Sequence, residues 1–145
     1  MADGAGLVLV GSAAAAVRLG LAPRARVAAS ASAGGHPVRM LVAGQDAARI
    51  ALDRAGVTPG ELDVVEFAEA FAALCLKLQR DFGLDDEVLN PNGGTIAMGH
   101  AFGATGAILT AGCVDELERS GGQYGLVAVS GAAGSGAALV LERAE

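Results

Sequence analysis

The feature that most constrains the fold of this sequence is residues 104–114, which have the length of a helix but no polar face. Apolar or small side chains lie on every side of this helix: Ala107, Ile108, Leu109, Ala111, Gly112 and Cys113. A helix that is apolar all round has to be buried on all sides. A single sheet in a domain of this size can cover only one of those sides. We therefore expect another chain or another domain to cover the opposite side.

Strands and helices alternate along the rest of the chain, as the hydrophobic periodicity indicates. Short apolar or β-branched runs predict strands at 7–10, 26–32, 64–67, 124–130 and 137–141, and helical spacing predicts helices at 13–19, 45–55, 71–82 and 104–119. A serine cap at Ser12, a capping box over residues 58–61 and a glycine stop at Gly83 support these boundaries. The alternation predicts one α/β domain over residues 1–145, ending in an antiparallel hairpin.

Composition narrows the classes of partner. Hydrophobic residues make up 52% of the chain and aromatic residues only 3%, so we expect a core of Ala, Val, Leu and Ile. The formal net charge is -6 without any Lys/Arg cluster, which argues against nucleic acid or an anionic membrane surface as the main partner. Cys75 and Cys113 lie in helical patterns without metal-ligand spacing, so buried thiols and no metal site are expected. Without a basic leader or an apolar run of about 20 residues, we expect a cytoplasmic protein with no membrane insertion.

Three segments carry residue types suited to chemistry. Residues 90–106 form a loop rich in Gly and Asn around His100, a residue type that often serves as an acid-base or oxyanion group but is also found in purely structural roles. Residues 66–72 place Glu69 at an expected helix start, where capping alone would explain it. Residues 130–136 form a glycine-rich turn between two strands, which could cradle a ligand through backbone N–H groups or be only a turn.

Together and in this order, the three segments resemble the C-terminal signatures of the thiolases. Those signatures are an Asn-Glu-Ala-Phe box, an Asn-x-Asn-Gly-Gly…Gly-His-Pro box and a final Cys-x-Gly-Gly-Gly-x-Gly box. The resemblance runs from Asp3 to Arg143 and covers only the C-terminal of the two similar halves that make up a thiolase. It implies a thiolase-like half with a mixed sheet covered by helices in layers. It also implies that residues 104–114 belong to a helix layer shared by the two halves.

The resemblance further implies roles for individual positions. In thiolases a cysteine of the N-terminal half takes up the acyl group from a coenzyme A (CoA) thioester, and the histidine that His100 matches activates this cysteine and helps to hold the thioester oxygen. The asparagine of the first box holds a water of the same oxyanion hole, and the cysteine of the last box moves the proton of the carbanion. Positions expected to line the substrate site are Phe71, Asn92, Gly93, Gly94, Gly99, Gly131, Ala132 and Gly134. No cofactor is expected, since the CoA thioester is itself the substrate or ligand.

Several positions depart from the family pattern. Ala68 stands where the water-holding asparagine belongs, and Ser130 stands where the proton-transferring cysteine belongs. A serine hydroxyl is a far weaker acid than a thiol with a pKa near 8.5. Ala101 replaces the proline after the histidine, and we expect it to loosen the placement of His100. Ala132 and Ala133 replace two glycines, which is costly if the turn requires positive φ.

These features predict a thiolase-like acyltransferase subunit or domain acting on CoA thioesters, inactive alone because the nucleophile-bearing half is absent from this sequence. Neither Cys75 nor Cys113 is expected to replace the nucleophile, because both lie within helices. The expected partner is a separate N-terminal half or a second copy of the chain. The alternative is a non-catalytic, degenerate module that binds acyl-CoA or stabilises a lipid-metabolic complex. A fragment of a longer protein is a third possibility.

Overall fold

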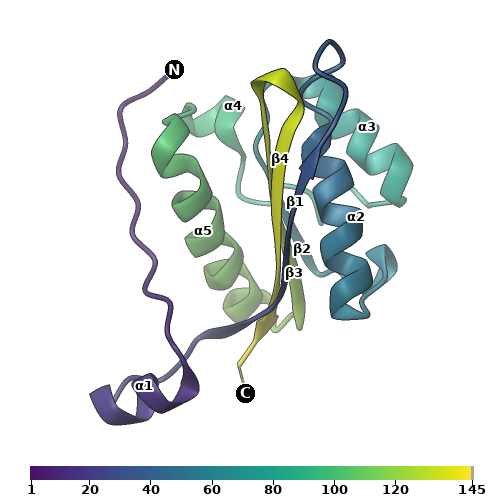
Figure 1. The fold of residues 1–145 in the computed structure, drawn as a ribbon. Coiled ribbons are helices and arrows are strands. Elements are labelled where there is room, and N and C mark those ends of the chain that lie inside the picture. The colour runs from purple at the N-terminus through teal and green to yellow at the C-terminus, as the bar shows by residue number, and fades with distance from the viewer. Residues whose placement is uncertain (145) are drawn as a thin grey trace.

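Four strands form one mixed sheet in the computed structural model, which describes residues 1–144 (Figure 1). They are β1 (Ala25–Gly34), β2 (Val64–Phe67), β3 (Tyr124–Gly131) and β4 (Ser135–Arg143), in the order β1-β4-β3-β2. Strand β4 is antiparallel to both of its neighbours, whereas β2 and β3 are parallel. The predicted α/β class, the mixed sheet and the terminal antiparallel hairpin are therefore confirmed.

Helices cover both faces of the sheet (Figure 1). On one face, α2 (Ala43–Ala55) packs over β1 and β4, and α3 (Ala72–Phe82) lies beside it. On the other face, α5 (Thr105–Ser120) packs over β2 and β3. The remaining short elements are α1 (Ala13–Leu19), η1 (Pro59–Glu61), α4 (Thr95–Met98), η2 (Phe102–Ala104) and η3 (Ala132–Gly134). The core is built from small and aliphatic side chains, as the composition predicts.

The local signals for helix ends act as predicted. The Ser12 side chain accepts a hydrogen bond from the Ala15 N–H at 3.2 Å and caps α1. The backbone N–H and the hydroxyl of Thr58 both donate to the carboxylate of Glu61, at 2.8 and 2.7 Å, and so close the predicted capping box around η1. Gly83 ends α3 with φ +67°, a conformation that glycine adopts without steric cost.

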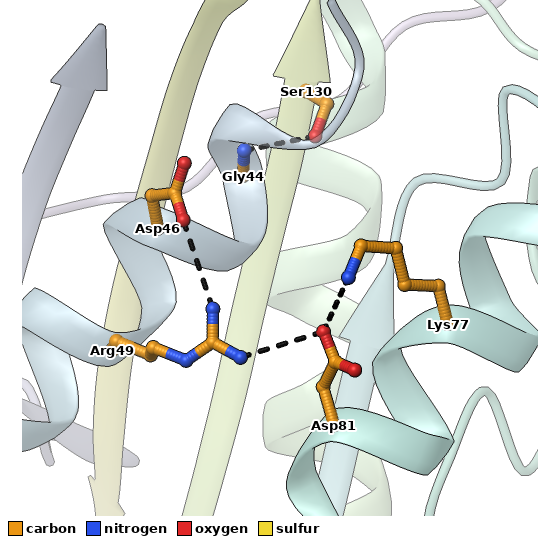
Figure 2. Close-up of polar contacts among 6 residues, drawn as sticks. All are labelled: Gly44, Asp46, Arg49, Lys77, Asp81 and Ser130. Carbon is orange, nitrogen blue, oxygen red and sulfur yellow. Dashed lines mark hydrogen bonds and ion pairs between the residues drawn. The ribbon is translucent and has the colours of Figure 1, made fainter. Parts of the chain in front are cut away.

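A chain of ion pairs joins α2 to α3 (Figure 2). The guanidinium of Arg49 lies 3.6 Å from Asp46 in its own helix and 3.4 Å from Asp81 in α3. Lys77 contacts the same Asp81 carboxylate at 2.5 Å. Each exposed pair contributes only about 0–1 kcal/mol. They therefore add little to the stability of the contact between the two helices.

The strand predicted at 7–10 is wrong. These residues are extended but pair with no other strand, and the exposed fractions of Leu7 and Leu9 are 96% and 78%. The N-terminal segment runs along the outer side of α5 (Figure 1), so that this helix lies between the segment and the sheet. A strand forms only where another strand satisfies its backbone groups. The apolar pattern is therefore present without the neighbour that a strand requires.

Helix α5 is covered unequally on its two sides. Leu109, Cys113 and Leu117 face the sheet and are at most 1% exposed. On the other side Ile108 and Val114 are only half-buried, although residues 1–6 lie against part of this surface. One face of the helix is thus covered by the sheet, as predicted, and the cover of the opposite face stays a prediction. No helix within residues 1–144 combines the length and apolarity that crossing a bilayer requires.

Candidate active site

The three predicted segments meet at one end of the sheet. Strands β1, β2 and β3 run in the same direction, and the loops that follow them lie together at the top of the view in Figure 1. These loops are residues 35–42, 68–71 and 131–134, and residues 90–104 with α4 and η2 lie at the same end. Ligands of open α/β sheets bind outside the carboxyl ends of the strands. This end of the sheet is therefore the candidate active site.

His100 is held in one orientation by the start of α5. Its Nδ1 lies 2.8 Å from the hydroxyl oxygen of Thr105, a residue that is only 2% exposed. The imidazole also lies against the Phe102 ring, with 4.6 Å between ring centroids and 57° between ring planes. The other ring nitrogen, Nε2, makes no hydrogen bond within residues 1–144. The imidazole is thus half-buried and fixed, with one nitrogen available for acid-base or oxyanion chemistry in either tautomer.

The asparagine loop before His100 is tied to the scaffold. The side chain of Asn90 accepts from the Phe67 N–H at 2.8 Å and donates to the Phe67 carbonyl at 3.1 Å. The Asn92 amide donates to Glu116 of α5 at 2.8 Å. Asn90 therefore fixes the loop to the end of β2, and the Asn92 amide is already engaged with α5.

Glycines set the path of this loop. Gly93 and Gly99 have φ of +82° and +88°, which favours glycine at both positions. Gly94 approaches the carboxylate of Glu69 and the amide of Asn90 so closely that a β-carbon would overlap both. These three predicted site glycines thus have structural reasons to be glycine. Their backbone also lies at the candidate site.

Glu69 caps a different helix from the one expected. Helix α3 begins only at Ala72, so Glu69 does not lie in its first turn. Instead, its carboxylate accepts a hydrogen bond from the Ile96 N–H of α4 at 2.9 Å. Its own backbone N–H donates to the Thr95 hydroxyl at 2.7 Å. Glu69 does cap a helix, as expected, but the helix is α4 and not α3. The Thr95 hydroxyl that it contacts lies 26 residues further along the chain.

Ala68 brings no polar group to the site. It is 3% exposed and packs in the cluster formed by α5 and the sheet, with Leu109 and Val127. Its backbone N–H continues the sheet by donating to the Ala128 carbonyl at 3.0 Å. Phe71, the residue directly before α3, has an exposed fraction of 64% at the margin of the site. The position at which the resemblance predicts a water-holding asparagine therefore offers only a methyl group.

Ser130 lies at the end of β3 and is 8% exposed (Figure 2). Its hydroxyl oxygen accepts a hydrogen bond from the Gly44 N–H at 2.9 Å, at the start of α2. A β-carbon on Gly44 would overlap that oxygen, so the short distance requires glycine there. The serine is thus fixed by a donor that also carries the positive end of the helix dipole.

The turn after Ser130 adopts the strained shape that the sequence suggests. Ala133 has φ +57° and ψ +20°, whereas Ala132 does not have positive φ. Gly134 has φ +80° and accepts a hydrogen bond at its carbonyl from the Gly35 N–H at 2.7 Å. The positive-φ cost expected for two alanines therefore falls on Ala133 alone. Gly131 precedes the turn and leaves room for the Ser135 side chain.

Neither cysteine is suited to act as a nucleophile. Burial, with the nearby Glu69 carboxylate as a smaller cause, raises the pKa of the Cys75 thiol to about 11. Burial raises the pKa of the fully buried Cys113 thiol to about 12. Because the thiolate is the reactive form, both side chains are inert near neutral pH. Within residues 1–144, no group of three or more His, Cys, Asp or Glu side chains is placed to hold a metal ion.

Two features of this region escaped the sequence analysis. Glu66 is 3% exposed in β2, and burial, followed by repulsion from Glu116 and Glu69, raises its pKa to about 7. Thr105, which orients His100, follows the histidine motif but has no signal of its own in the sequence. A charged residue inside a short apolar strand is the one signal that could have singled out Glu66.

Comparison with known proteins agrees with this architecture. Residues 21–143 match the family model described as "Thiolase, C-terminal domain". The chain is 43% identical over 143 residues to the 3-oxoadipyl-CoA/3-oxo-5,6-dehydrosuberyl-CoA thiolase of Escherichia coli, and the match covers 97% of this chain and 36% of that protein. Identity is 42% over 141 residues to the beta-ketothiolase BktB of Cupriavidus necator and 43% over 141 residues to an acetyl-CoA acetyltransferase of Paracoccus denitrificans, with the same coverage. The chain thus spans about a third of the length of these relatives, and it belongs to the thiolase family as the C-terminal half of the thiolase fold.

Proposed function

We propose that this chain is one part of a thiolase-like acyltransferase that acts on CoA thioesters, and that a nucleophile-bearing N-terminal half completes the site. The observation that carries the proposal is the geometry of His100. Thr105 fixes its imidazole while Nε2 stays available at the end of the sheet where the three family segments meet. A fixed imidazole can take the proton from an incoming cysteine thiol and hold the thioester oxygen.

The chain alone lacks the means for a complete thiolase cycle. Carbon–carbon bond formation passes through a carbanion, which needs a group that moves a proton near neutral pH. Ser130 offers only a hydroxyl, and its oxygen already accepts from the Gly44 N–H. Acyl transfer and thioester hydrolysis need no carbanion, since the acyl group moves from the sulfur of CoA to a nucleophile and CoA leaves as the thiol. We therefore propose acyl-group handling as the activity that this site retains once a nucleophile is supplied.

The expected partner covers the open side of α5. A groove of about 460 Å³ lies between α5 and the sheet, lined by aliphatic residues such as Val129 and Leu139 together with Ser30, Ser32 and Arg54. Together with the half-buried face of α5, this surface is partly apolar, and residues 1–6 cover only part of it. Exposed apolar surfaces of this kind mark interaction sites. We propose the N-terminal half, as part of the same protein or as a separate chain, as the covering unit, and a second copy as the other candidate.

The binding part of the proposal is tested with the chain and acetyl-CoA. Affinity is measured by isothermal titration and native mass spectrometry for the unmodified chain and for His100→Ala. The loss of one hydrogen bond to the thioester oxygen, worth about 1 kcal/mol, should weaken binding roughly fivefold. Gln123→Ala is the matched control, because Gln123 is exposed just before β3, at the opposite end of the sheet, and its amide makes one hydrogen bond, to Glu142 at 3.2 Å. Equal affinity in all three proteins, or no binding at all, contradicts the proposal.

The second candidate is a non-catalytic module that binds acyl-CoA or stabilises a lipid-metabolic complex. The observation that favours it is the absence of a polar side chain at Ala68. The two candidates are separated by adding the N-terminal part of the E. coli relative and measuring acyl transfer, with and without Ala68→Asn combined with Ser130→Cys. Activity of the unmodified chain above that of the added part alone supports the enzyme. Activity that appears only with both substitutions supports the non-catalytic module.

A further inference from the structure

We infer that Phe102 is a positioning residue, whose ring holds the His100 imidazole in the orientation that leaves Nε2 free. The centroids of the two rings are 4.6 Å apart, and the ring planes are tilted by 57°. The Phe102 side chain is 62% exposed, so burial in the core does not account for its place. Its backbone has φ +37°, a conformation that is unusual for a bulky L-residue. A residue that is both exposed and strained is explained by what it contacts, and the Phe102 ring contacts His100.

The strain of Phe102 lies in the turn that leads into α5. The Ala104 N–H donates to the Ala101 carbonyl at 3.0 Å and closes this turn. Its two central residues are Phe102 and Gly103. The positive φ falls on Phe102 and not on the neighbouring glycine, although glycine adopts this conformation without steric cost. Glycine at position 102 would therefore make the same turn with less strain, but it would lack the ring that lies against His100.

A second contact is needed because one hydrogen bond does not fix an imidazole. The Thr105 hydroxyl lies 2.8 Å from Nδ1 of His100 and holds that corner of the ring. The ring can still tilt about this point, and a tilt moves Nε2, which lies away from the hydrogen bond. The Phe102 ring lies against the imidazole and blocks the tilt toward it, in a tilted arrangement that aromatic pairs favour. The hydrogen bond and the ring contact together therefore define where Nε2 lies.

The backbone next to His100 places little restriction on the histidine. Ala101 follows it with φ -90° and ψ +28°. Alanine leaves φ free to vary, whereas the proline of the family motif would lock it. The contact with Phe102 therefore supplies a constraint that the backbone lacks. Its importance for acyl-group handling rests on the proposed function, whereas the placement of the imidazole does not.

The placement is tested by NMR of the histidine rings in the full chain. The chain has two histidines, and His36→Ala identifies the signals of His100 by elimination. The nuclear Overhauser contact between the His100 ring and the Thr105 methyl group is measured for the unmodified chain, Phe102→Ala and Phe102→Tyr. We expect the alanine variant to lose this contact and the tyrosine variant, which keeps the ring, to retain it. Leu76→Ala is the matched control, because Leu76 lies in α3 and is 63% exposed. A contact that persists in Phe102→Ala overturns the inference.

A pair of variants separates the ring from the backbone strain. Phe102→Ala and Phe102→Gly both remove the ring, but only glycine relieves the positive φ. We expect the thermal midpoint of the glycine variant to lie a few degrees above that of the alanine variant. Both should lose the contact between His100 and Thr105 to the same extent, whereas a merely structural role would make the loss follow the midpoint. A glycine variant that is the less stable of the two shows that Phe102 is not strained and overturns the inference.

Binding of acetyl-CoA connects the placement to the proposed function. Phe102→Ala should weaken binding by no more than the roughly fivefold expected for His100→Ala, because it acts through that histidine. The double variant should therefore bind as weakly as His100→Ala alone. Losses that add in the double variant show that Phe102 itself contacts the ligand, which overturns a positioning role. If no variant and no unmodified chain binds acetyl-CoA while Phe102→Ala loses the NMR contact, the proposed function is refuted and the positioning of His100 is supported.

Discussion

Replacement of Ala133 by glycine should stabilise this protein, although most substitutions in a folded domain destabilise it. Ala133 lies in the turn between β3 and β4 with φ +57° and ψ +20°, and its side chain is exposed. The left-handed conformation costs an L-residue about 1–2 kcal/mol, and glycine avoids this cost. Glycine also raises the conformational entropy of the unfolded chain, which lowers the free energy of unfolding by about 0.4–1 kcal/mol. We expect Ala133→Gly to raise the free energy of unfolding by about 0.5–1 kcal/mol, the difference between these effects.

The assay is urea unfolding followed by circular dichroism, with Ala132→Gly as the control. Ala132 is exposed in the same turn but does not have positive φ, so glycine brings no relief there. We expect this control to lose about 0.5–1 kcal/mol through the unfolded state. The thermal midpoints should move apart in the same directions, by a few degrees for a chain of this size. If the two variants are destabilised equally, Ala133 does not hold the left-handed conformation and the reasoning is refuted.

Three further predictions concern the surroundings of the site. Burial raises the folded-state pKa of Glu66 to about 7. The free energy of unfolding should therefore fall as pH rises from about 4.5 to 7. Glu66→Gln should flatten this dependence in urea titrations between about pH 4.5 and 8. Asn90→Ala should lower the free energy of unfolding by about 2–3 kcal/mol in the same assay. It removes two buried hydrogen bonds to Phe67 and places alanine at φ +48°, a conformation that asparagine tolerates better. Cys75 and Cys113 should both resist alkylation by iodoacetamide at pH 8 in the folded chain and react readily in urea, and rapid labelling of Cys113 under native conditions would contradict its burial.

The elements that the sequence predicts correctly are those determined by local pattern. The periodicity and the caps locate α1, α2 and α3 to within one or two residues. Strand β4 is longer than the predicted 137–141 because it pairs along most of its length with strands on both sides, which extends it to Ser135–Arg143. The run 7–10 shows the opposite case, because its local preference for a strand is clear but the pairing strand is missing. Strand formation depends on distant residues in a way that helix formation does not.

In the candidate site, too, the sequence predicts local features and misses long-range contacts. The motifs place His100 and the glycine-rich turns at the right points of the chain, because each motif is contiguous in sequence. The hydrogen bonds that position these residues are long-range: Ser130 and Gly44 are 86 residues apart, and Asn92 and Glu116 are 24 residues apart. No spacing rule predicts such pairs from one sequence. The role of Glu69 was misjudged for this reason, because its partner lies in a helix that the motif does not include.

The loops at the end of the sheet contain strained backbone conformations, although Ala68 and Ser130 depart from the residues of the family pattern. Four non-glycine residues within residues 1–144 have positive φ, namely Leu41, Asn90, Phe102 and Ala133, and all four lie in these loops. Each such conformation costs on the order of 1–3 kcal/mol and persists only where surrounding contacts impose it. Those contacts include the Asn90 bonds to Phe67 and the bond between Gly35 and the carbonyl of Gly134. The loops keep the backbone conformations that these contacts impose, and the departures at Ala68 and Ser130 are changes of side chain alone. Under the proposed function, this combination fits a site that handles a thioester without forming a carbanion.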